Sequence, residues 1–173
     1  MSPSRLRSLY LLIPVVIVAL DQWSKNLVLN HLRQYQDSID VIPNFFRIVH
    51  YRNTGAAFGL GNASGSWVST VLTVAAIAVM VFVAIYAWRS SPRERILQTA
   101  LHLVMGGAIG NLVDRFQHGS VIDFLDVYVV VGGMPRHWPA FNVADSAICI
   151  GIGLLILDTI LKPSERTTLA DAS

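Results

Sequence analysis

The segment WVSTVLTVAAIAVMVFVAIYAW, residues 67–88, predicts a class of fold most directly. It contains no charged residue, and it begins and ends with tryptophan, at Trp67 and Trp88. As an α-helix rising about 1.5 Å per residue, it is long enough to cross the roughly 30 Å of hydrocarbon in a bilayer. Tryptophan favours the two membrane interfaces. The segment therefore predicts a membrane-spanning helix.

Three further segments on either side of this helix have spanning length: residues 9–29, 96–115 and 141–161. Polar residues interrupt two of them, Asp21 and Lys25 in the first and Asp145 and Asp158 in the last. The whole chain is 53% hydrophobic and only 14% charged, whereas a soluble domain is usually about 25% charged. Its mean hydropathy is +0.52. We therefore predict four membrane spans.

The third predicted span contains a pair of glycines with a spacing that matters for packing. Its residues 96–113 include no Asp, Glu, Lys or Arg, and Gly106 and Gly110 lie four residues apart. This small-xxx-small spacing lets two membrane helices approach closely. We expect the third span to pack inside the bundle, although the same glycines could also contact a second chain.

A cleaved signal peptide is the main alternative for the first span. Arg5 and Arg7 precede an apolar run, as they would in such a signal. The residues after that run, Asp21-Gln22-Trp23, do not form the small-residue cleavage site that a signal peptide needs. We therefore expect the segment to be retained as a helix.

The distribution of basic residues predicts the orientation of the bundle. Four spans place both termini on one side, and Lys and Arg favour cytoplasmic ends. Basic residues flank the two chain ends and the connection between the second and third spans: Arg5, Arg7, Arg89, Arg93, Arg95, Lys162 and Arg166. We therefore predict that both termini are cytoplasmic and that the chain is a multi-pass protein of the bacterial inner membrane.

Two long segments, about 31–66 and 116–139, would then lie on the outer side. Residues 41–43 and 45–51 are compatible with short strands of a small sheet. Residues 121–131 are too short and too charged for a span, which favours an interfacial segment with its apolar side chains in lipid or against the bundle.

These observations define the expected architecture. We predict a single membrane domain over residues 1–173, an all-α integral membrane protein with four transmembrane helices. A small extracytoplasmic β-sheet and a short interfacial segment complete it. Because each odd-numbered span runs outward and each even-numbered span runs inward, the polar residues of the spans converge on the outer interface.

Carboxylates within or beside these apolar stretches are the strongest functional signal. Ionisable groups at bilayer depth are costly, so a functional site is the default hypothesis for them. There are five: Asp21, Asp114, Asp123, Asp126 and Asp145. Asp145 is the sharpest case, because residues 141–157 are otherwise uncharged. We therefore predict acid-base chemistry at a membrane surface.

Structural roles explain several of these residues equally well. Asp21 and Lys25 are four apart on one helix face and can form a simple ion pair. Asn111 and Arg115 have the same spacing, and a guanidinium can neutralise either a carboxylate or a lipid phosphate. Asp123 could merely solvate the edge of an amphipathic segment. The residues alone leave Asp114 and Asp123 as competing candidates for a partner of Asp145.

Other residue types give weaker signals. His102 lies mid-helix without a nearby His, Cys or carboxylate in sequence, which favours an interior histidine over a metal ligand. The single Cys149 excludes an internal disulfide and a multi-thiolate metal site, and we expect it to pack in a helix as a small apolar residue. A net charge of +2 is too small to indicate a nucleic-acid partner. No metal or other cofactor is expected.

A water-activating carboxylate pair is the simplest chemistry for two aspartates at this interface. Close carboxylates resist ionising together, so one of them keeps a proton. The ionised member can accept a proton from water while the protonated member hydrogen-bonds a peptide carbonyl. This is the chemistry of an aspartic protease.

Five short blocks of the sequence, in order, resemble a known family. They are Asp21-Gln22-x-Ser24-Lys25, Asn53-Thr54-Gly55-Ala56-Ala57-Phe58, Asn111-x-x-Asp114-Arg115, Val121-x-Asp123-Phe124 and Phe141-Asn142-x-Ala144-Asp145-Ser146. Together they are similar to the motifs of bacterial lipoprotein signal peptidase, the type II signal peptidase. Any single block is weak, whereas five in order across four spans are highly specific.

This resemblance implies an activity, a set of partners and roles for individual residues. It implies a membrane aspartyl endopeptidase that removes the signal peptide from diacylglyceryl-modified prolipoproteins, on the amino side of the lipidated cysteine. The implied partners are such lipidated substrates, membrane lipids and cyclic peptide antibiotics of the globomycin type. The implied residue roles are catalysis by Asp123 and Asp145, substrate binding or site ordering by Asn53, Gly55, Asn111, Arg115 and Asn142, and polar support by Asp21, Lys25 and Asp114.

Two other classes of protein remain as alternatives. A small proton-coupled transporter would also keep intramembrane carboxylates and glycine-rich helices, but these acids cluster at one interface and no inverted repeat is apparent. A membrane scaffold would use the outer segments to bind a partner, and it should tolerate asparagine in place of Asp145.

Overall fold

The computed structural model describes residues 2–54 and 67–162 of the chain. It contains five helices: α1 (Pro3–Tyr10), α2 (Leu12–His31), α3 (Trp67–Arg89), α4 (Arg95–His118) and α5 (Val143–Leu161). Because α1 and α2 follow one another as one long apolar segment, these helices form four candidate membrane crossings. The four predicted spans are thereby confirmed, each with ends displaced by a few residues.

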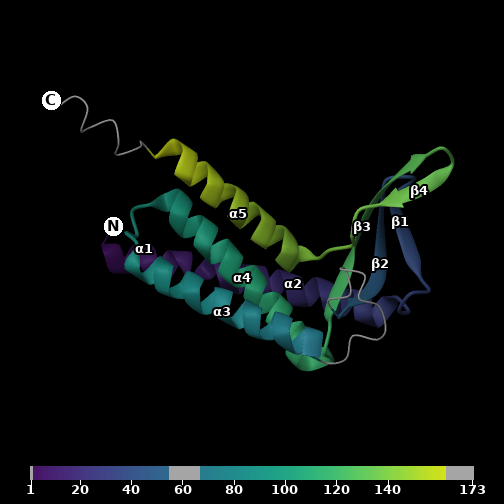
Figure 1. Ribbon diagram of the computed structural model, residues 1–173, viewed down its shortest axis with the longest axis horizontal. Helices are drawn as coiled ribbons and strands as arrows, with labels where there is room; N and C mark the ends of the chain where they lie inside the picture. Colours follow the sequence, from purple (N-terminus) through teal and green to yellow (C-terminus); the bar gives the residue numbers. More distant parts are fainter. Residues whose placement is uncertain (1, 55–66, 163–173) are drawn as a thin grey trace.

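The bundle has two different ends (Figure 1). At one end α1 begins, α3 connects to α4, and α5 ends. We call this the connection end. At the other end, the sheet end, α2 leads into a β-sheet and the same sheet returns the chain to α5. The described parts of the two long non-spanning segments therefore lie together at one end of the bundle, as predicted; residues 55–66 of the first lie outside the described residues.

Helix α4 is the central helix of the bundle. Most of its residues are buried inside the protein, whereas each of the other three crossings buries only a small share of its residues. Gly106 and Gly110 lie where α4 meets α2: a Cβ added at Gly106 would lie 2.9 Å from Ile17 Cβ, and one at Gly110 would lie 2.6 Å from Asp21 Oδ2. The predicted close approach is confirmed, and it occurs within the chain.

Four strands form one antiparallel sheet in the order β1-β2-β3-β4. They are β1 (Ser38–Ile42), β2 (Phe46–Asn53), β3 (Val121–Val131) and β4 (Met134–His137). A small sheet was expected at residues 41–43 and 45–51, where strands β1 and β2 are found. Gly132 and Gly133 join β3 to β4 with φ of 62° and 77°, the left-handed backbone that a two-residue hairpin turn requires.

The sheet corrects one expectation. The protein is not all-α, since its helix bundle carries a four-stranded sheet. Residues 121–131, expected at the interface with apolar side chains in lipid or against the bundle, form strand β3, and the first half of this strand is buried within the protein. Asp126 is 1% exposed and pairs with Arg47 of β2. That partner lies in a different segment of the sequence, so local patterning did not indicate it.

A small apolar cluster fastens the sheet to the bundle. Val28 and Leu32 at the end of α2 pack with Phe124 of β3, and Ile48 and Val143 border the same cluster. Burial of such side chains contributes roughly 1.5–3 kcal/mol each. The start of β3 and the start of α5 are thereby held together at the sheet end.

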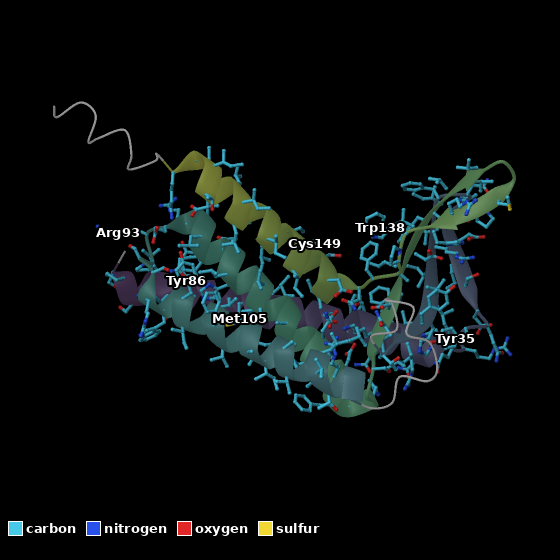
Figure 2. All side chains as sticks on the ribbon, in the orientation of Figure 1. Tyr35, Tyr86, Arg93, Met105, Trp138 and Cys149 are labelled. Atoms are coloured by element: carbon cyan, nitrogen blue, oxygen red, sulfur yellow. The ribbon has the colours of Figure 1, made fainter. Side chains whose placement is uncertain are left out.

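The outward faces of the bundle are apolar, as the side chains in Figure 2 show along α3 and α5. Cys149 lies in α5, as expected, but it is exposed on that surface. His102 is an interior residue, as expected, with its Nδ1 2.7 Å from the carbonyl oxygen of Gln98 and its ring stacked on Tyr10.

Candidate active site

Asn142 connects two of the predicted site residues. It is fully buried and forms the N-cap of α5, where its Oδ1 accepts from the backbone N–H of Asp145 at 2.9 Å. This is the usual way in which asparagine begins a helix. Its Nδ2 donates to Asp123 Oδ1 at 2.9 Å. One side chain thus fixes both the start of α5 and the Asp123 carboxyl.

Two further amides complete this arrangement. Asn111 of α4 donates from Nδ2 to Asp145 Oδ1 at 2.8 Å, and its Oδ1 accepts from Asn142 at 3.2 Å. Asn53, the last residue of β2, donates from Nδ2 to Asp123 Oδ2 at 3.0 Å. Asp123 and Asp145 therefore belong to one hydrogen-bond chain that joins two strands and two helices.

The environment of Asp123 favours its protonated form. Its side chain comes from β3 and the residue is 3% exposed. The pKa of the Asp123 carboxyl is raised to about 7, first by burial and second by the charge of Asp145, although hydrogen bonds from Asn53 and Asn142 oppose the change. Two carboxylates that disfavour each other's ionisation can share a proton near neutral pH.

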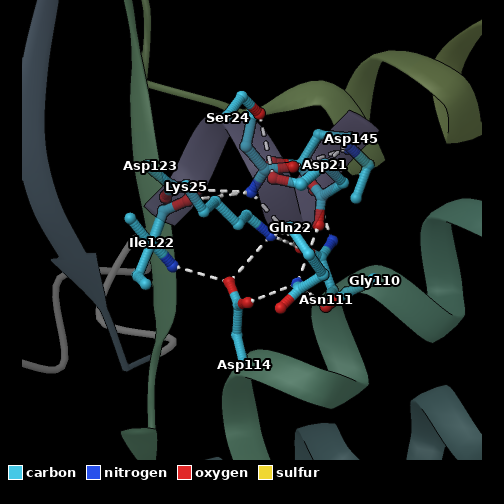
Figure 3. Close-up of polar contacts among 12 residues, drawn as sticks. Asp21, Gln22, Ser24, Lys25, Gly110, Asn111, Asp114, Ile122, Asp123 and Asp145 are labelled. Atoms are coloured by element: carbon cyan, nitrogen blue, oxygen red, sulfur yellow. Dashed lines mark hydrogen bonds and ion pairs between the residues drawn. The ribbon is translucent and has the colours of Figure 1, made fainter. Parts of the chain in front are cut away.

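A buried ion cluster lies directly beside this pair (Figure 3). Lys25 Nζ lies 2.7 Å from Asp21 Oδ2 and 2.7 Å from Asp114 Oδ2. It also donates to Asn111 Oδ1 at 3.4 Å. The predicted ion pair between Asp21 and Lys25 is confirmed, and Asp114 is a second partner that sequence spacing did not indicate.

The two cluster aspartates also hold the backbone of the site. Asp21 Oδ1 accepts from the N–H of Ala144 at 3.0 Å, and Asp114 Oδ2 accepts from the N–H of Ile122 at 3.0 Å. Ala144 directly precedes Asp145, and Ile122 directly precedes Asp123. The ion cluster therefore fixes the main chain next to each member of the pair.

Gln22 is a site residue to which the sequence gave no separate role. Its Nε2 donates to Asp114 Oδ1 at 2.9 Å and to the carbonyl oxygen of Gly110 at 3.2 Å (Figure 3). It therefore ties α2 to α4 beside Lys25. Its place in the block Asp21-Gln22-x-Ser24-Lys25 was the available signal.

Arg115 places a positive charge near the carboxylates. Its Nη1 donates to the backbone oxygen of Asn111 at 3.4 Å. Its charge acts on Asp145, Asp114 and Asp123, the first of these most strongly. The sequence left a carboxylate or a lipid phosphate as the partner of Arg115, and the structure places these three carboxylates within electrostatic range of it.

Two residues singled out in the sequence are not part of the described site. Gly55 lies outside the described residues. Asp126 is buried in the sheet, apart from the chain of amides, where it accepts from Arg47 Nε at 2.7 Å and lies 2.9 Å from His137 Nδ1. In the part of the chain that the structure describes, no group of three or more His, Cys, Asp or Glu could hold a metal ion.

The fold and the site together define a class of protein: a membrane helix bundle in which side-chain amides join two carboxyls, suited to acid-base chemistry, where the bundle meets a sheet. Residues 13–161 match the family described as signal peptidase (SPase) II. The chain belongs to the signal peptidase II family.

Individual relatives agree over nearly the full length. The chain is 43% identical to the lipoprotein signal peptidase of Photorhabdus laumondii, over 91% of each chain. It is 48% identical to that of Alteromonas mediterranea, over 91% of this chain and 84% of the relative. A solved bacterial membrane enzyme superposes with a TM-score of 0.76 at 32% identity, covering 91% of this chain and 95% of the other.

Proposed function

We propose that this protein removes the signal peptide from diacylglyceryl-modified prolipoproteins as an aspartic-type endopeptidase, cutting on the amino side of the lipidated cysteine. Membership of the signal peptidase II family and the relatives called lipoprotein signal peptidase support the activity. The observation that carries the mechanism is the hydrogen-bond chain that joins Asp123 and Asp145 through Asn142 and Asn111.

In this mechanism the two aspartates share one proton. The ionised carboxylate accepts a proton from water, whose oxygen attacks the scissile carbonyl carbon, while the protonated carboxyl hydrogen-bonds the carbonyl oxygen. Collapse of the tetrahedral intermediate breaks the C–N bond, and the acquired proton passes to the leaving amine. Because the pair titrates as a unit, neither proton belongs permanently to one residue.

The neighbouring residues position this pair. Asn53, Asn111 and Asn142 orient the carboxyl oxygens through their amide donors. The supporting residues Asp21, Lys25 and Asp114 hold the adjoining backbone in the buried cluster. Arg115 stabilises negative charge that develops during the reaction. Gly55, outside the described residues, is assigned to substrate binding or ordering of the site.

The site also fits a substrate that arrives from the membrane. With both termini cytoplasmic, the sheet end faces outward, where the signal helix of a prolipoprotein ends and its diacylglyceryl group lies. The substrate then enters laterally from the bilayer. Globomycin-type cyclic peptides are expected to bind at the same pair and compete with the substrate.

The test is cleavage of a diacylglyceryl-modified prolipoprotein by the purified protein in lipid. Asp123→Asn and Asp145→Asn should each lower kcat by about 100- to 10,000-fold, the range of a lost acid or base. Asp40→Asn, at an exposed position of β1, is the matched control and should cleave normally. Full activity in both site variants would overturn the mechanism.

The transporter and scaffold alternatives make opposite predictions in the same assay. A proton-coupled transporter would not cleave the substrate at all, and a scaffold would keep its full binding function after Asp145→Asn. Neither alternative is supported by the family to which the chain belongs.

A further inference from the structure

The tip of the β3–β4 hairpin has an unusual composition for a segment outside the helices. Residues 129–135 read VVVGGMP and contain no polar side chain. We call them the hairpin tip. Val129, Val131 and Met134 are 49%, 60% and 60% exposed, and Val130 is 45% exposed. Such a contiguous exposed apolar patch marks an interaction site rather than ordinary surface.

Both faces of the hairpin tip are apolar. Val131 lies opposite Met134, and Val130 lies opposite Pro135. Since side chains on successive strand residues point to opposite faces, these two pairs lie on different faces of the hairpin. A folded protein partner covers one face of a two-stranded ribbon, whereas a fluid lipid environment surrounds both.

The edge of the hairpin is poorly suited to a protein partner that would add a strand. Strand β4 has only four residues, and its Pro135 lacks the backbone N–H that such pairing uses. The backbone groups of the turn and of the outer edge still need polar partners, which the hydrocarbon core cannot offer. These two facts favour the boundary between headgroups and acyl chains.

The residues that follow the hairpin tip match this boundary. Arg136 is exposed, and its guanidinium is suited to lipid phosphate. Trp138 is 69% exposed, and tryptophan is enriched at membrane interfaces. Asn142, which caps the membrane helix α5, follows four residues later. The apolar surface of the hairpin is therefore continuous in sequence with a segment that enters the membrane.

The base of the hairpin is rigidly held. His137 Nδ1 lies 2.9 Å from Asp126 Oδ1, and Arg47 Nε lies 2.7 Å from Asp126 Oδ2. The ring of His137 stacks on Tyr128 with 5.1 Å between the ring centroids. Figure 1 shows the hairpin projecting from the rest of the sheet on the side of α5. The tip is therefore presented at a fixed angle.

We propose that the hairpin tip inserts into the interfacial region of the outer leaflet and anchors the sheet to the membrane. Its occupant is lipid: acyl chains against the valines and Met134, and phosphate at Arg136. This anchoring is independent of whether the protein cleaves prolipoproteins, and its test does not measure cleavage.

The test uses a fluorophore in lipid nanodiscs that each hold one protein. Cys149→Ser removes the native thiol, and Val131→Cys then carries an environment-sensitive dye at the tip. Because Val131 is exposed, the change removes no core contact. The matched control is Ser38→Cys on exposed strand β1. An unchanged thermal unfolding curve of both labelled variants verifies the fold.

The dye at residue 131 should emit at shorter wavelength than the dye at residue 38. Lipids with a nitroxide near the headgroup should quench it at least about twofold more strongly than they quench the control, as expected for interfacial depth. Aqueous iodide should quench mainly the control. Equal quenching by iodide at both sites would overturn the proposal. So would a blue shift without nitroxide quenching, which would show that protein covers the tip.

Discussion

At the scale of single residues, Asn142 carries two separable contacts, a cap for α5 and a donor to Asp123. Asn142→Ala loses both, whereas Asn142→Ser keeps a cap acceptor but is too short to reach Asp123. We expect both variants to lose about 100-fold in kcat, the penalty of a misplaced catalytic group. Only the alanine variant should also lose about 1 kcal/mol of stability from the missing cap.

This comparison is made by measuring kcat and the thermal unfolding of both variants in the same lipid. A loss of kcat confined to the alanine variant, together with its loss of stability, would show that the cap, and not the donor to Asp123, is the important contact.

The raised pKa of Asp123 predicts a pH dependence of activity. Its carboxyl is half protonated at about 7, so the pair loses its shared proton as the pH rises through that value. We expect kcat/KM to fall above about pH 7. The affinity for a substrate analogue that binds but is not cleaved should show no such fall. A flat profile up to pH 9, measured in lipid at constant ionic strength, would contradict this role for Asp123.

The same pKa has a defined effect on stability. The pKa of an aspartate in an unfolded chain is about 3.9, whereas that of Asp123 in the folded protein is about 7. Between these two pH values the folded protein holds a proton at Asp123 that the unfolded chain has lost. The stabilising contribution is therefore complete below the unfolded pKa and lost as the pH rises through the folded one. Asp123→Asn should remove this slope from the unfolding free energy, and an unchanged slope would count against it.

Several residue-scale features could be predicted because they are local in sequence. Asp21 and Lys25 are one helical turn apart, so their ion pair follows from spacing. The contact between Lys25 and Asp114 joins two helices and has no signature in spacing. Spacing alone left Asp114 and Asp123 as competing partners of Asp145, and only the family resemblance assigned Asp114 to support. The structure adds the contact through which Asp114 holds the backbone, its bond from the N–H of Ile122.

At the scale of the helices, close packing of α4 on α2 depends on Gly110. A Cβ there would lie 2.6 Å from Asp21 Oδ2, an oxygen that Lys25 binds. We expect Gly110→Ala to destabilise the protein by about 1–3 kcal/mol through overpacking. Gly153 of α5 is the matched control, since a Cβ there meets nothing within 4 Å.

Gly153→Ala should instead stabilise the protein by roughly 0.5–1 kcal/mol, because alanine favours a helix. Thermal unfolding in detergent compares the two variants. Equal effects of both substitutions would mean that helix propensity, and not contact between α2 and α4, determines the role of Gly110.

The helices were predictable to within a few residues because apolar length is a local property. Strand β3 was not, because the partner of its Asp126 is Arg47 of β2, and two helices, α3 and α4, separate the two strands in sequence. The length of residues 121–131 and their two charges, Asp123 and Asp126, predicted only that the segment does not span the membrane.

At the scale of the whole molecule, contacts at the connection end place three segments on one side of the membrane. Lys162 Nζ lies 2.8 Å from Glu94 Oε1, which links the end of α5 to the connection between α3 and α4. Arg7 of α1 donates to the carbonyl oxygen of Ser90 at 3.3 Å. The orientation of any one segment therefore determines the other two, and the basic residues of all three favour the cytoplasm.

We therefore expect the sheet end, with the carboxyl pair, to face outward. In intact spheroplasts, a membrane-impermeant maleimide should label Asp40→Cys on β1, whereas Ser91→Cys at the connection end should react only after the membrane is opened. Both positions are exposed, so accessibility to solvent is matched. Each variant carries Cys149→Ser, and that parent alone gives the background. The reverse labelling pattern would show that the carboxyl pair faces the cytoplasm. The pair could then not reach a substrate whose lipidated cysteine lies at the outer face.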